Sequence, residues 1–386
     1  MSDLTEYIGN VDAFPVLRRW NFFNHAGVCP IPKVAADALR KFADEAAGGA
    51  YLGTSWYPDL DKLRALAARI INADREEIAL VKNTSEGISI VANGLDWQWG
   101  DRIVTTAVEY PANVYPWMEV ARSHGAKLVM VPEEQAPDGS RTVRLEKILR
   151  EAEDPRTRIV SLSHVEFASG QRHDVAQIGA FCRANKKLFN VDAIQSIGAV
   201  PVDVKGMNID YLSADGHKWM LGPEGAGIFY CRRELLERTR PLMLGAMNVI
   251  NALEYGSYDY TLKPDAGRFE CGSLSLASFF SLKGSLELIE AIGVSNIASR
   301  IKQLTDRLIA GLIAKGYGVV SPRGGDEWSG IVSFLSTEHA HEAIFRTLRR
   351  EHHTEIALRE GRLRASPHFY NTDEQIDRLV HLLPAH

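Results

Sequence analysis

Two polar side chains follow apolar, strand-like runs and could take part in carbonyl–amine chemistry. Lys218 follows the run 210–215 and stands beside a glycine-rich loop, 222–227. An amine there is a candidate for a Schiff base with an aldehyde, although most lysines simply lie at the surface. Asp192 closes the run 187–192. A buried carboxylate needs a partner such as a protonated pyridine nitrogen, and capping of the next turn is the simpler alternative.

Three more residues at strand ends could hold the rest of a flat, phosphorylated ligand. Thr84 and Ser85 follow the run 78–81 and precede a helical pattern. A helix N-terminus with added hydroxyls favours an anion, although Ser and Thr are also common as plain N-caps. Tyr110 follows the run 102–108 and could stack on a ring or fill the rim of the core. Phosphate cradle, stacking ring, acid and amine together are what pyridoxal 5′-phosphate requires.

The elements that must position these residues alternate between strands and helices. Strand-like runs cover 78–81, 102–108, 127–131, 158–165, 187–192, 210–215 and 227–232, and helical patterns follow several of them, at 86–95, 114–124 and 174–186. This alternation predicts an α/β fold with a mostly parallel sheet covered by helices. In an open parallel sheet, ligands bind at the carboxyl ends of the strands.

The alternation of strand-like and helical patterns ends after about residue 256. Two long helical patterns, 276–293 and 295–316, lead into short β-like runs and two more helices. We therefore predict a large cofactor-binding domain over residues 21–275 and a small C-terminal α+β domain over residues 276–386. We expect the N-terminal segment, residues 1–20, to pack near the small domain.

Composition excludes several classes of protein. The chain has 386 residues, 45% of them apolar and 24% charged, with a net charge of −5. This mild acidity argues against nucleic acid or an anionic membrane as the main partner, and no run approaches the ~18 apolar residues of a membrane span. The first residues lack the pattern of a signal peptide, so we expect a cytoplasmic protein whose four cysteines are reduced. No metal-ligand spacing appears, and we predict no metal site.

The motifs resemble those of the class V aminotransferase family of fold type I pyridoxal-phosphate enzymes, which includes cysteine desulfurases, selenocysteine lyases and isopenicillin N epimerase-like proteins. The resemblance extends from about residue 22 to about residue 382. It is carried by 83–87 (NTSEG), 192–196 (DAIQS), 216–218 (GHK), 268–273 (RFECGS), and 363–366 (LRAS) with 370–372 (YNT). It implies a seven-stranded type of large-domain sheet, pyridoxal 5′-phosphate as cofactor, an α-amino acid as substrate and a homodimer.

The resemblance also implies roles for the residues that act on the reacting centre. Lys218 would form the Schiff base and, once released by substrate, move the proton of Cα. Asp192 would keep the pyridine nitrogen protonated, and Gln195 would donate to the phenolic oxygen of the ring. Tyr110 would stack on the ring, and Arg364 would bind the α-carboxylate of the substrate.

The remaining implied contacts hold the phosphate. Thr84, Ser85 and His217 resemble its ligands within one subunit. Ser273 resembles the residue that reaches the phosphate from the partner subunit, which places the sites at a dimer interface.

Departures from the family pattern bear on the reaction. Desulfurases of this group carry a mobile loop with a nucleophilic Cys between segments that here are contiguous, 358–361 and 362–364, and no Cys follows Cys271. Persulfide formation on a protein thiol is therefore not expected. Tyr110 replaces a His and is a poorer proton shuttle at neutral pH. Phe167 replaces an Asn, and Asp215 replaces a Ser, so we expect Asp215 to point away from the phosphate or to pair with a cation.

We therefore expect an enzyme that uses pyridoxal phosphate on an α-amino acid, with transamination as the leading reaction. The alternatives are a lyase or epimerase without the persulfide Cys loop and, from another class, a non-catalytic protein that binds the cofactor. Cys29 we interpret as a small residue in a tight turn, because no activating group neighbours it in the sequence.

Overall fold

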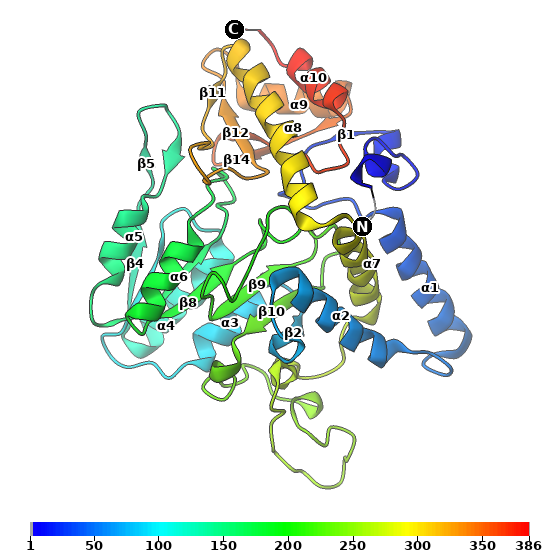
Figure 1. Cartoon of the computed structure of the whole chain (residues 1–386), viewed down its shortest axis with the longest axis vertical. Coiled ribbons are helices and arrows are strands. Elements are labelled where there is room, and N and C mark those ends of the chain that lie inside the picture. The colour runs from blue at the N-terminus through cyan, green and yellow to red at the C-terminus, as the bar shows by residue number, and fades with distance from the viewer. Residues whose placement is uncertain (1–2, 386) are drawn as a thin grey trace.

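A seven-stranded sheet organises the large part of the molecule (Figure 1), described by a computed structural model that covers residues 3–385. The strand order is β2-β10-β9-β8-β7-β3-β4. β10 is antiparallel to both of its neighbours, and all other neighbours are parallel. The predicted α/β class with a mostly parallel sheet is confirmed.

The elements of this part alternate along the chain as the sequence predicted. They are β2 (Ile78–Val81), α3 (Thr84–Gly94), β3 (Arg102–Thr106), α4 (Tyr115–His124), β4 (Lys127–Val131), α5 (Leu145–Ala152), β7 (Thr157–Ser163), α6 (Val175–Ala184), β8 (Leu188–Asp192), β9 (Tyr211–Asp215) and β10 (Gly227–Cys231). A short hairpin joins β5 (Glu134–Gln135) to β6 (Arg141–Thr142).

Alternating side chains of the central strands fill two separate cores. In β10, Ile228 belongs to one apolar cluster and Phe229 to the other. In β9, Leu212 and Tyr211 divide in the same way. Successive side chains of a strand point to opposite faces, so the two clusters are the two helix-covered faces of one sheet. Burial on both faces explains why these runs lack a polar alternation.

The C-terminal part has its own antiparallel sheet, ordered β11-β12-β15-β14. Its elements are α8 (Val294–Ala314), β11 (Gly318–Val319), β12 (Val332–Leu335), α9 (His341–Glu351), β13 (Thr354–Glu355), β14 (Ala357–Arg359), β15 (Arg362–Ala365) and α10 (Asp373–Leu382). A third apolar cluster joins α8, through Leu304 and Leu308, to Ile376 and Leu379 of α10. The C-terminal part therefore combines helices with an antiparallel sheet, as expected for the predicted α+β class.

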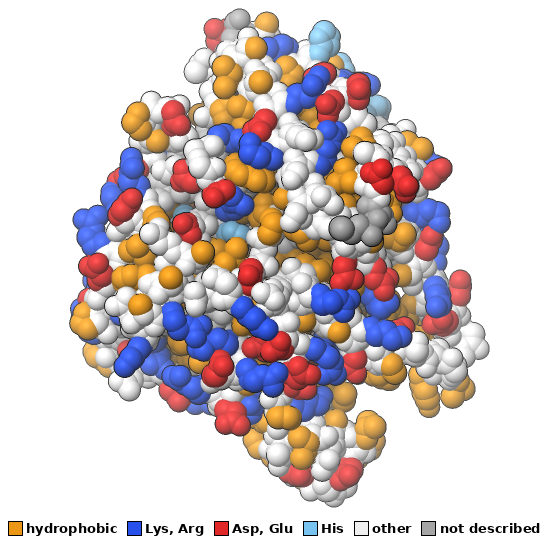
Figure 2. All heavy atoms as spheres, viewed as in Figure 1, with side chains coloured by type: hydrophobic (Ala, Val, Ile, Leu, Met, Phe, Trp, Pro, Cys, Tyr) orange, Lys and Arg blue, Asp and Glu red, His pale blue; other side chains and the backbone are white. Residues whose placement is uncertain are grey.

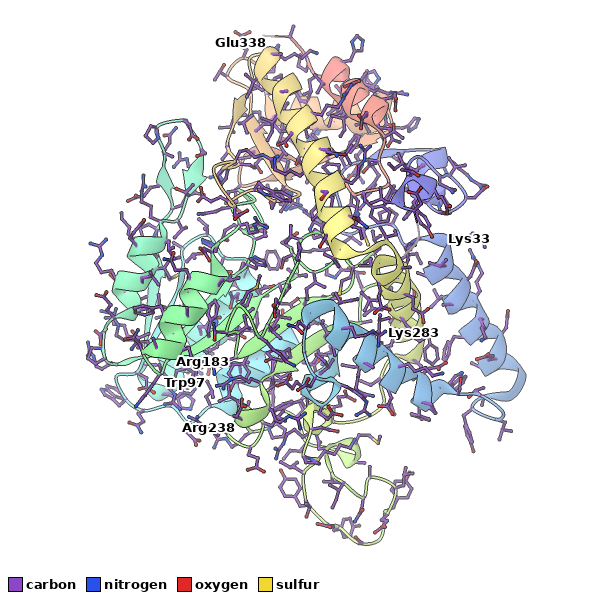
Figure 3. All side chains as sticks on the ribbon, in the orientation of Figure 1. Lys33, Trp97, Arg183, Arg238, Lys283 and Glu338 are labelled. Atoms are coloured by element: carbon purple, nitrogen blue, oxygen red, sulfur yellow. The ribbon has the colours of Figure 1, made fainter. Side chains whose placement is uncertain are left out.

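The N-terminal segment contacts this C-terminal part. β1 (Asn21–Phe22) pairs in parallel with β13, and Phe14 stacks on Tyr370 with 3.8 Å between ring centroids. α1 (Lys33–Gly49) and α2 (Trp56–Ile71) then pack along α7 (Leu276–Ile292), on which Figure 3 labels Lys283. The limits of the domains stay a prediction. α7 lies in the range that we assigned to the small domain, and its Leu282 is buried in an apolar core of the large sheet.

A segment between residues 242 and 260 projects from the large part at the bottom of Figures 1 and 2. Its exposed large side chains are Leu242, Leu244, Ile250, Leu253, Tyr255, Tyr258 and Tyr260. Within residues 3–385 no helix is long and apolar enough to cross a membrane.

Gly198 allows two segments of the site to approach each other. It has a φ of +92°, and a Cβ added there would lie 2.2 Å from the carbonyl oxygen of Trp219. We predict that Gly198→Ala lowers the free energy of unfolding by roughly 1–3 kcal/mol or more, because both the backbone conformation and the close approach oppose a side chain. Chemical denaturation measures this change.

Gly48→Ala is the matched control. Gly48 is an exposed residue near the C-terminal end of α1, and nothing surrounds its Cβ position within 4 Å. That variant should be stabilised by roughly 0.5–1 kcal/mol, since alanine favours a helix over glycine. Equal stability of the Gly198 variant and the wild type would refute the close approach.

Candidate active site

A cavity of about 580 Å³ lies at the carboxyl ends of the parallel strands. It gathers most of the residues that the sequence predicted for the site: Thr84, Ser85, Tyr110, Asp192, Gln195, His217, Lys218 and Arg364. Ser273 is not among the lining residues; it is exposed, shortly before α7. The predicted site residues, separated by up to 280 positions along the chain from Thr84 to Arg364, therefore converge on one cavity except for Ser273.

Lys218 lies in the turn that follows β9, after Gly216 and His217, with its side chain buried. The backbone around it is tight: Gly216 donates to the carbonyl of Ala226 at 2.8 Å, and Gly222 donates to that of Gly216 at 2.8 Å. Burial lowers the pKa of the Lys218 ammonium to about 8, against the attraction of Asp192. A lowered pKa makes an amine available as a nucleophile and proton carrier near neutral pH.

Asp192 ends β8, between Ser163 of β7 and Ser213 of β9. One of its oxygens accepts a hydrogen bond from the Ile194 amide at 3.0 Å. Within the described chain no cation lies within ion-pair distance of this buried carboxyl, and burial raises its pKa to about 6. A protonated pyridine nitrogen would supply the missing positive charge, so this position fits the cofactor.

The N-terminus of α3 faces the same cavity. The alternative interpretation of Thr84 or Ser85 as a plain N-cap is wrong: the Asn83 side chain accepts from the Glu86 amide at 2.9 Å. The reason is that a cap lies one position before the first helical residue, which here is Thr84. The hydroxyl and amide groups of Thr84 and Ser85 thus stand in the first turn, where an anion is favoured.

Asp215 lies in the cavity beside His217, with 3.0 Å between a carboxylate oxygen and Nδ1. Its backbone amide donates to the Thr84 hydroxyl at 3.0 Å. The expected pairing with a cation is thus available through His217 when that imidazole is protonated. Such pairing offsets the repulsion between Asp215 and a phosphate.

Gln195 is held by two groups on different segments. Its amide nitrogen donates to the Ala26 carbonyl at 3.1 Å, and its oxygen accepts from the Trp219 indole at 2.8 Å. The second amide hydrogen stays free to donate into the cavity. Tyr110, half exposed, meets the edge of Phe167 at 5.4 Å, and the Lys218 amine lies 5.5 Å from the centre of the Tyr110 ring.

Arg364 is a buried cation with neutral partners only. It is 1% exposed and donates to the Phe167 carbonyl at 2.6 Å and to the Asn24 side chain at 3.4 Å. Its Nε has no partner, and no carboxylate lies within ion-pair distance among residues 3–385. Burial lowers its pKa to about 9. A guanidinium in this state fits a carboxylate that enters with the ligand.

Sequence reasoning missed a buried acidic network behind Asp192. Glu109 accepts from the amide and the hydroxyl of Ser163 at 2.7 and 2.6 Å. Glu166 accepts from Thr106 at 2.9 Å and lies 3.0 Å from the His173 imidazole. Burial raises the pKa of both carboxyls, that of Glu166 to about 8. The signal that singled out Asp192, an acid at a strand end, also marks Glu109 and Glu166.

The thiols contribute nothing to the cavity wall. All four cysteines are among the described residues, and none lines the cavity. Cys29 is buried, its thiol lies 3.6 Å from the Gly222 carbonyl, and burial raises its pKa. β14 and β15 are joined by Glu360 and Gly361, both with positive φ, as in a tight hairpin turn. A mobile loop has no room there.

An amine, an unpaired acid, a helix N-terminus and an unpaired guanidinium around one cavity define a fold type I enzyme that depends on pyridoxal phosphate. The family model "Aminotransferase class-V" matches residues 21–379, and the chain belongs to that family. Pyridoxal 5′-phosphate is its cofactor.

Relatives within the family have been named for reactions at sulfur. A "Probable cysteine desulfurase" of Methanothermobacter thermautotrophicus is 33% identical, over 95% of this chain and 94% of the relative. A solved complex of the cystine C–S lyase C-DES with its product cysteine persulfide is 26% identical, with a TM-score of 0.86, over 95% of this chain and 98% of the other. A solved C-DES variant with glycine covalently linked to the cofactor is 25% identical, with a TM-score of 0.88, over 98% of this chain and 100% of the other.

The Glu166 carboxyl makes stability depend on pH. Its pKa of about 8 in the folded protein exceeds the ordinary 4.5, so between these values the folded chain binds a proton that the unfolded chain has lost. The free energy of unfolding therefore falls as pH rises, with a slope of at most about 1.4 kcal/mol per pH unit. We predict that Glu166→Gln, which keeps the neutral shape, flattens the decline between pH 6.5 and 8.

Denaturant titrations at several pH values test this prediction. The His173 pKa is lowered to about 4, so that imidazole is neutral in the folded protein, and the proton that it binds in the unfolded chain near pH 6.5 affects the wild type and the variant alike. Glu146→Gln, at an exposed position on α5, is the control and should keep the wild-type slope. Parallel curves for Glu166→Gln and the wild type would contradict the assignment of a buried proton to Glu166.

Proposed function

We propose that the chain is a pyridoxal-phosphate-dependent carbon–sulfur lyase acting on a sulfur-containing α-amino acid. The observation that carries the proposal is the pairing, in one cavity, of the buried Lys218 amine with the buried Arg364 guanidinium that lacks an acid. One group suits the amino end of such a substrate, and the other suits its carboxylate. The names of the relatives favour sulfur at the β-carbon.

Each residue then has a task that its surroundings support. Arg364 binds the α-carboxylate and fixes the orientation of Cα. Lys218, with its lowered pKa, takes the Cα proton. When bound, pyridoxal phosphate supplies an aldehyde for the amine and a protonated ring that accepts the electrons left at Cα. Asp192 keeps the ring nitrogen protonated, and Gln195 donates to the phenolic oxygen.

The remaining residues hold the cofactor in place. Thr84, Ser85 and His217 bind the phosphate at the N-terminus of α3. Tyr110 covers one face of the ring, and its contact with Phe167 limits how far its own ring can turn.

In this scheme the sulfur is released as a small molecule and is not transferred to a protein thiol. Loss of the Cα proton and cleavage of the Cβ–S bond release a thiolate, or a persulfide when the substrate is a disulfide, together with an enamine that hydrolyses to pyruvate and ammonia. A protein thiol is not needed, in agreement with the tight β14–β15 hairpin and with the burial of Cys29.

Transamination, the reaction favoured by the sequence alone, is the second candidate. It begins with the same transfer of the Cα proton to Lys218 and the same binding of the substrate carboxylate by Arg364. The missing thiol that favoured it is equally expected of a lyase that releases its sulfur with the product. The relatives therefore tip the choice toward cleavage.

The products formed from cystine distinguish the reactions. We predict that the holoenzyme turns cystine into pyruvate, ammonia and cysteine persulfide, without any keto acid, and that the visible absorption band of the cofactor returns after each turnover. Cys29→Ala should keep the wild-type rate, and Lys218→Ala should be inactive. Cystamine, which lacks the carboxylates that Arg364 would bind, should not be cleaved.

Other results have definite meanings. An absorption band that stops at the pyridoxamine form in the absence of a keto acid would establish transamination. Binding of cofactor without turnover of any amino acid would establish a non-catalytic protein. Loss of activity in Cys29→Ala with the fold intact would show that a protein thiol takes part.

We further propose a homodimer in which Ser273 completes the phosphate site of the partner subunit. Ser273 is exposed and outside the cavity of its own chain. The projecting segment 242–260 carries seven large exposed apolar side chains, which a second copy would cover. Light scattering should give twice 42.8 kDa, and Ser273→Ala should weaken the affinity for pyridoxal phosphate without changing that mass. A monomer of full activity would refute this proposal.

A further inference from the structure

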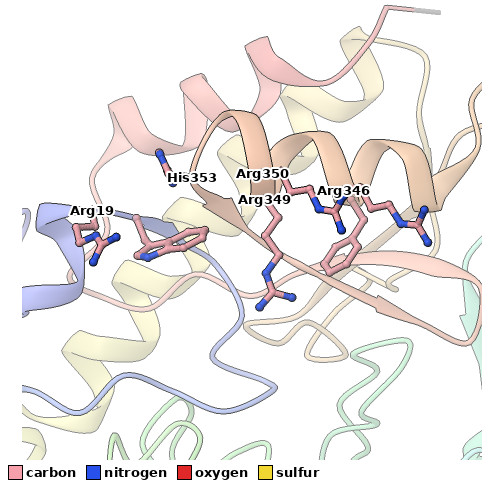
Figure 4. A pocket seen from close by; sticks show the side chains of 7 residues that line it. Arg19, Arg346, Arg349, Arg350 and His353 are labelled. Atoms are coloured by element: carbon pink, nitrogen blue, oxygen red, sulfur yellow. The ribbon is translucent and has the colours of Figure 1, made fainter.

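A second cavity, of about 490 Å³, lies between the N-terminal segment and α9 (Figure 4). We call it the arginine groove. Its lining residues are Arg19, Trp20, Phe345, Arg346, Arg349, Arg350 and His353. No residue of the active-site cavity belongs to it.

Positive charge in the arginine groove exceeds the charge that compensates it. Glu342 pairs with Arg346, and Glu355 pairs with Arg349 at 3.1 Å. Within residues 3–385, Arg19 and Arg350 have no carboxylate within ion-pair distance. Like charges spaced three and four residues apart on a helix destabilise it. The position of arginines at the end of α9 suits the helix dipole, but this does not explain Arg19, which comes from another segment.

The lining combines guanidinium groups with aromatic rings. Trp20 is half-buried, and its indole meets the His353 ring edge-on at 5.4 Å. Arg349 lies 5.9 Å from the centre of the Phe345 ring. Guanidinium groups bind phosphate oxygens in pairs, and an indole can stack on a flat ring. The cavity is within the range of ~300–1,000 Å³ usual for small-molecule sites.

We propose that the arginine groove binds a small anion that carries both phosphate groups and a flat ring, that is, a nucleoside diphosphate or a compound of that chemistry. The two unpaired arginines, Arg19 and Arg350, would bind the phosphates together with Arg349, which also lines the groove. Trp20 would contact the ring.

The arginine groove is joined to the active site by a chain of side-chain contacts. Arg349 pairs with Glu355, which lines the active-site cavity. Asn24 donates to Glu355 at 3.5 Å and accepts from Arg364 at 3.4 Å. An anion that engages Arg349 leaves the Glu355 carboxylate less compensated. That carboxylate would then oppose the entry of a substrate carboxylate, so an occupied groove weakens substrate binding. This consequence, unlike binding itself, rests on the proposed function.

Calorimetry of the holoprotein with ADP and with inorganic pyrophosphate tests the site. Both should bind saturably, ADP more tightly. Arg350→Gln should weaken binding of both about tenfold, the loss of one charge-assisted contact. Arg378→Gln is the matched control: an exposed arginine on α10, also without an ion-pair partner among residues 3–385, and outside the groove. Trp20→Leu should remove the preference for ADP and keep pyrophosphate binding.

Three results would overturn the site. These are no saturable binding by the wild type, equal weakening in Arg350→Gln and Arg378→Gln, and an ADP preference that survives Trp20→Leu in a folded protein. Circular dichroism of each variant separates a lost contact from a lost fold.

Steady-state kinetics test the connection separately. Saturating ADP should raise KM about fivefold and leave kcat unchanged, a typical size for coupling between two sites. At an ADP concentration equal to the wild-type dissociation constant, Arg350→Gln should respond about fivefold less than the wild type, because tenfold weaker binding leaves most of its grooves empty. An unchanged KM with ADP bound would overturn the connection. Because calorimetry needs no turnover, failure of the proposed reaction would leave the binding result standing.

Discussion

Three ionisable groups are buried with no opposite charge within ion-pair distance, and this constraint governs the rest of the structure. Lys218, Asp192 and Arg364 share one cavity, and no ion-pair partner lies within reach of any of them in residues 3–385. Burial shifts each pKa in the direction that favours the neutral form: it raises the pKa of Asp192 and lowers the pKa of Lys218 and Arg364. Such groups are costly to hold in place, so a rigid scaffold must keep them from collapsing onto each other or turning to solvent.

The scaffold is the carboxyl edge of a sheet that is buried on both faces. β8 and β9 end side by side, which fixes Asp192 close to the segment that carries Lys218. Trp219, next to Lys218, donates to Gln195, and Gly198 lets the two segments approach closely. Arg364 arrives from a different sheet, and its Asn24 contact comes from the N-terminal segment. The cavity therefore depends on how the two parts of the chain pack together.

The departures from the family pattern form a consistent set in space. Phe167 supplies an edge contact to Tyr110 and a carbonyl to Arg364. Its neighbour Glu166, whose pKa burial raises to about 8, contacts Thr106 and His173 behind Asp192. Hydrophobic and protonated neighbours lower the polarity around the place where a Cα proton would move. They provide no nucleophile, which agrees with the absence of a cysteine from the cavity wall.

The amino-acid sequence by itself was sufficient to predict which reactive residues lie together at one edge of the sheet. An acid, an amine or a hydroxyl after a buried apolar run must lie at one edge of a parallel sheet, so Asp192, Lys218 and Thr84 could be placed together from spacing alone. The contiguity of residues 358–364 likewise excluded a long loop, because chain connectivity is a property of the sequence itself.

Only the tertiary structure decided which charges lack a partner. Glu166 and His173 meet across a turn, and Arg19 meets the arginines of α9 from more than 320 positions away. Asn83 rather than Thr84 caps α3, and β10 runs antiparallel, because hydrogen bonds with neighbours in space settle both. Residue type shows what a side chain can do. The electric field and the hydrogen-bond partners that determine whether a side chain is protonated come from segments that are distant in the sequence. Only folding brings these segments together.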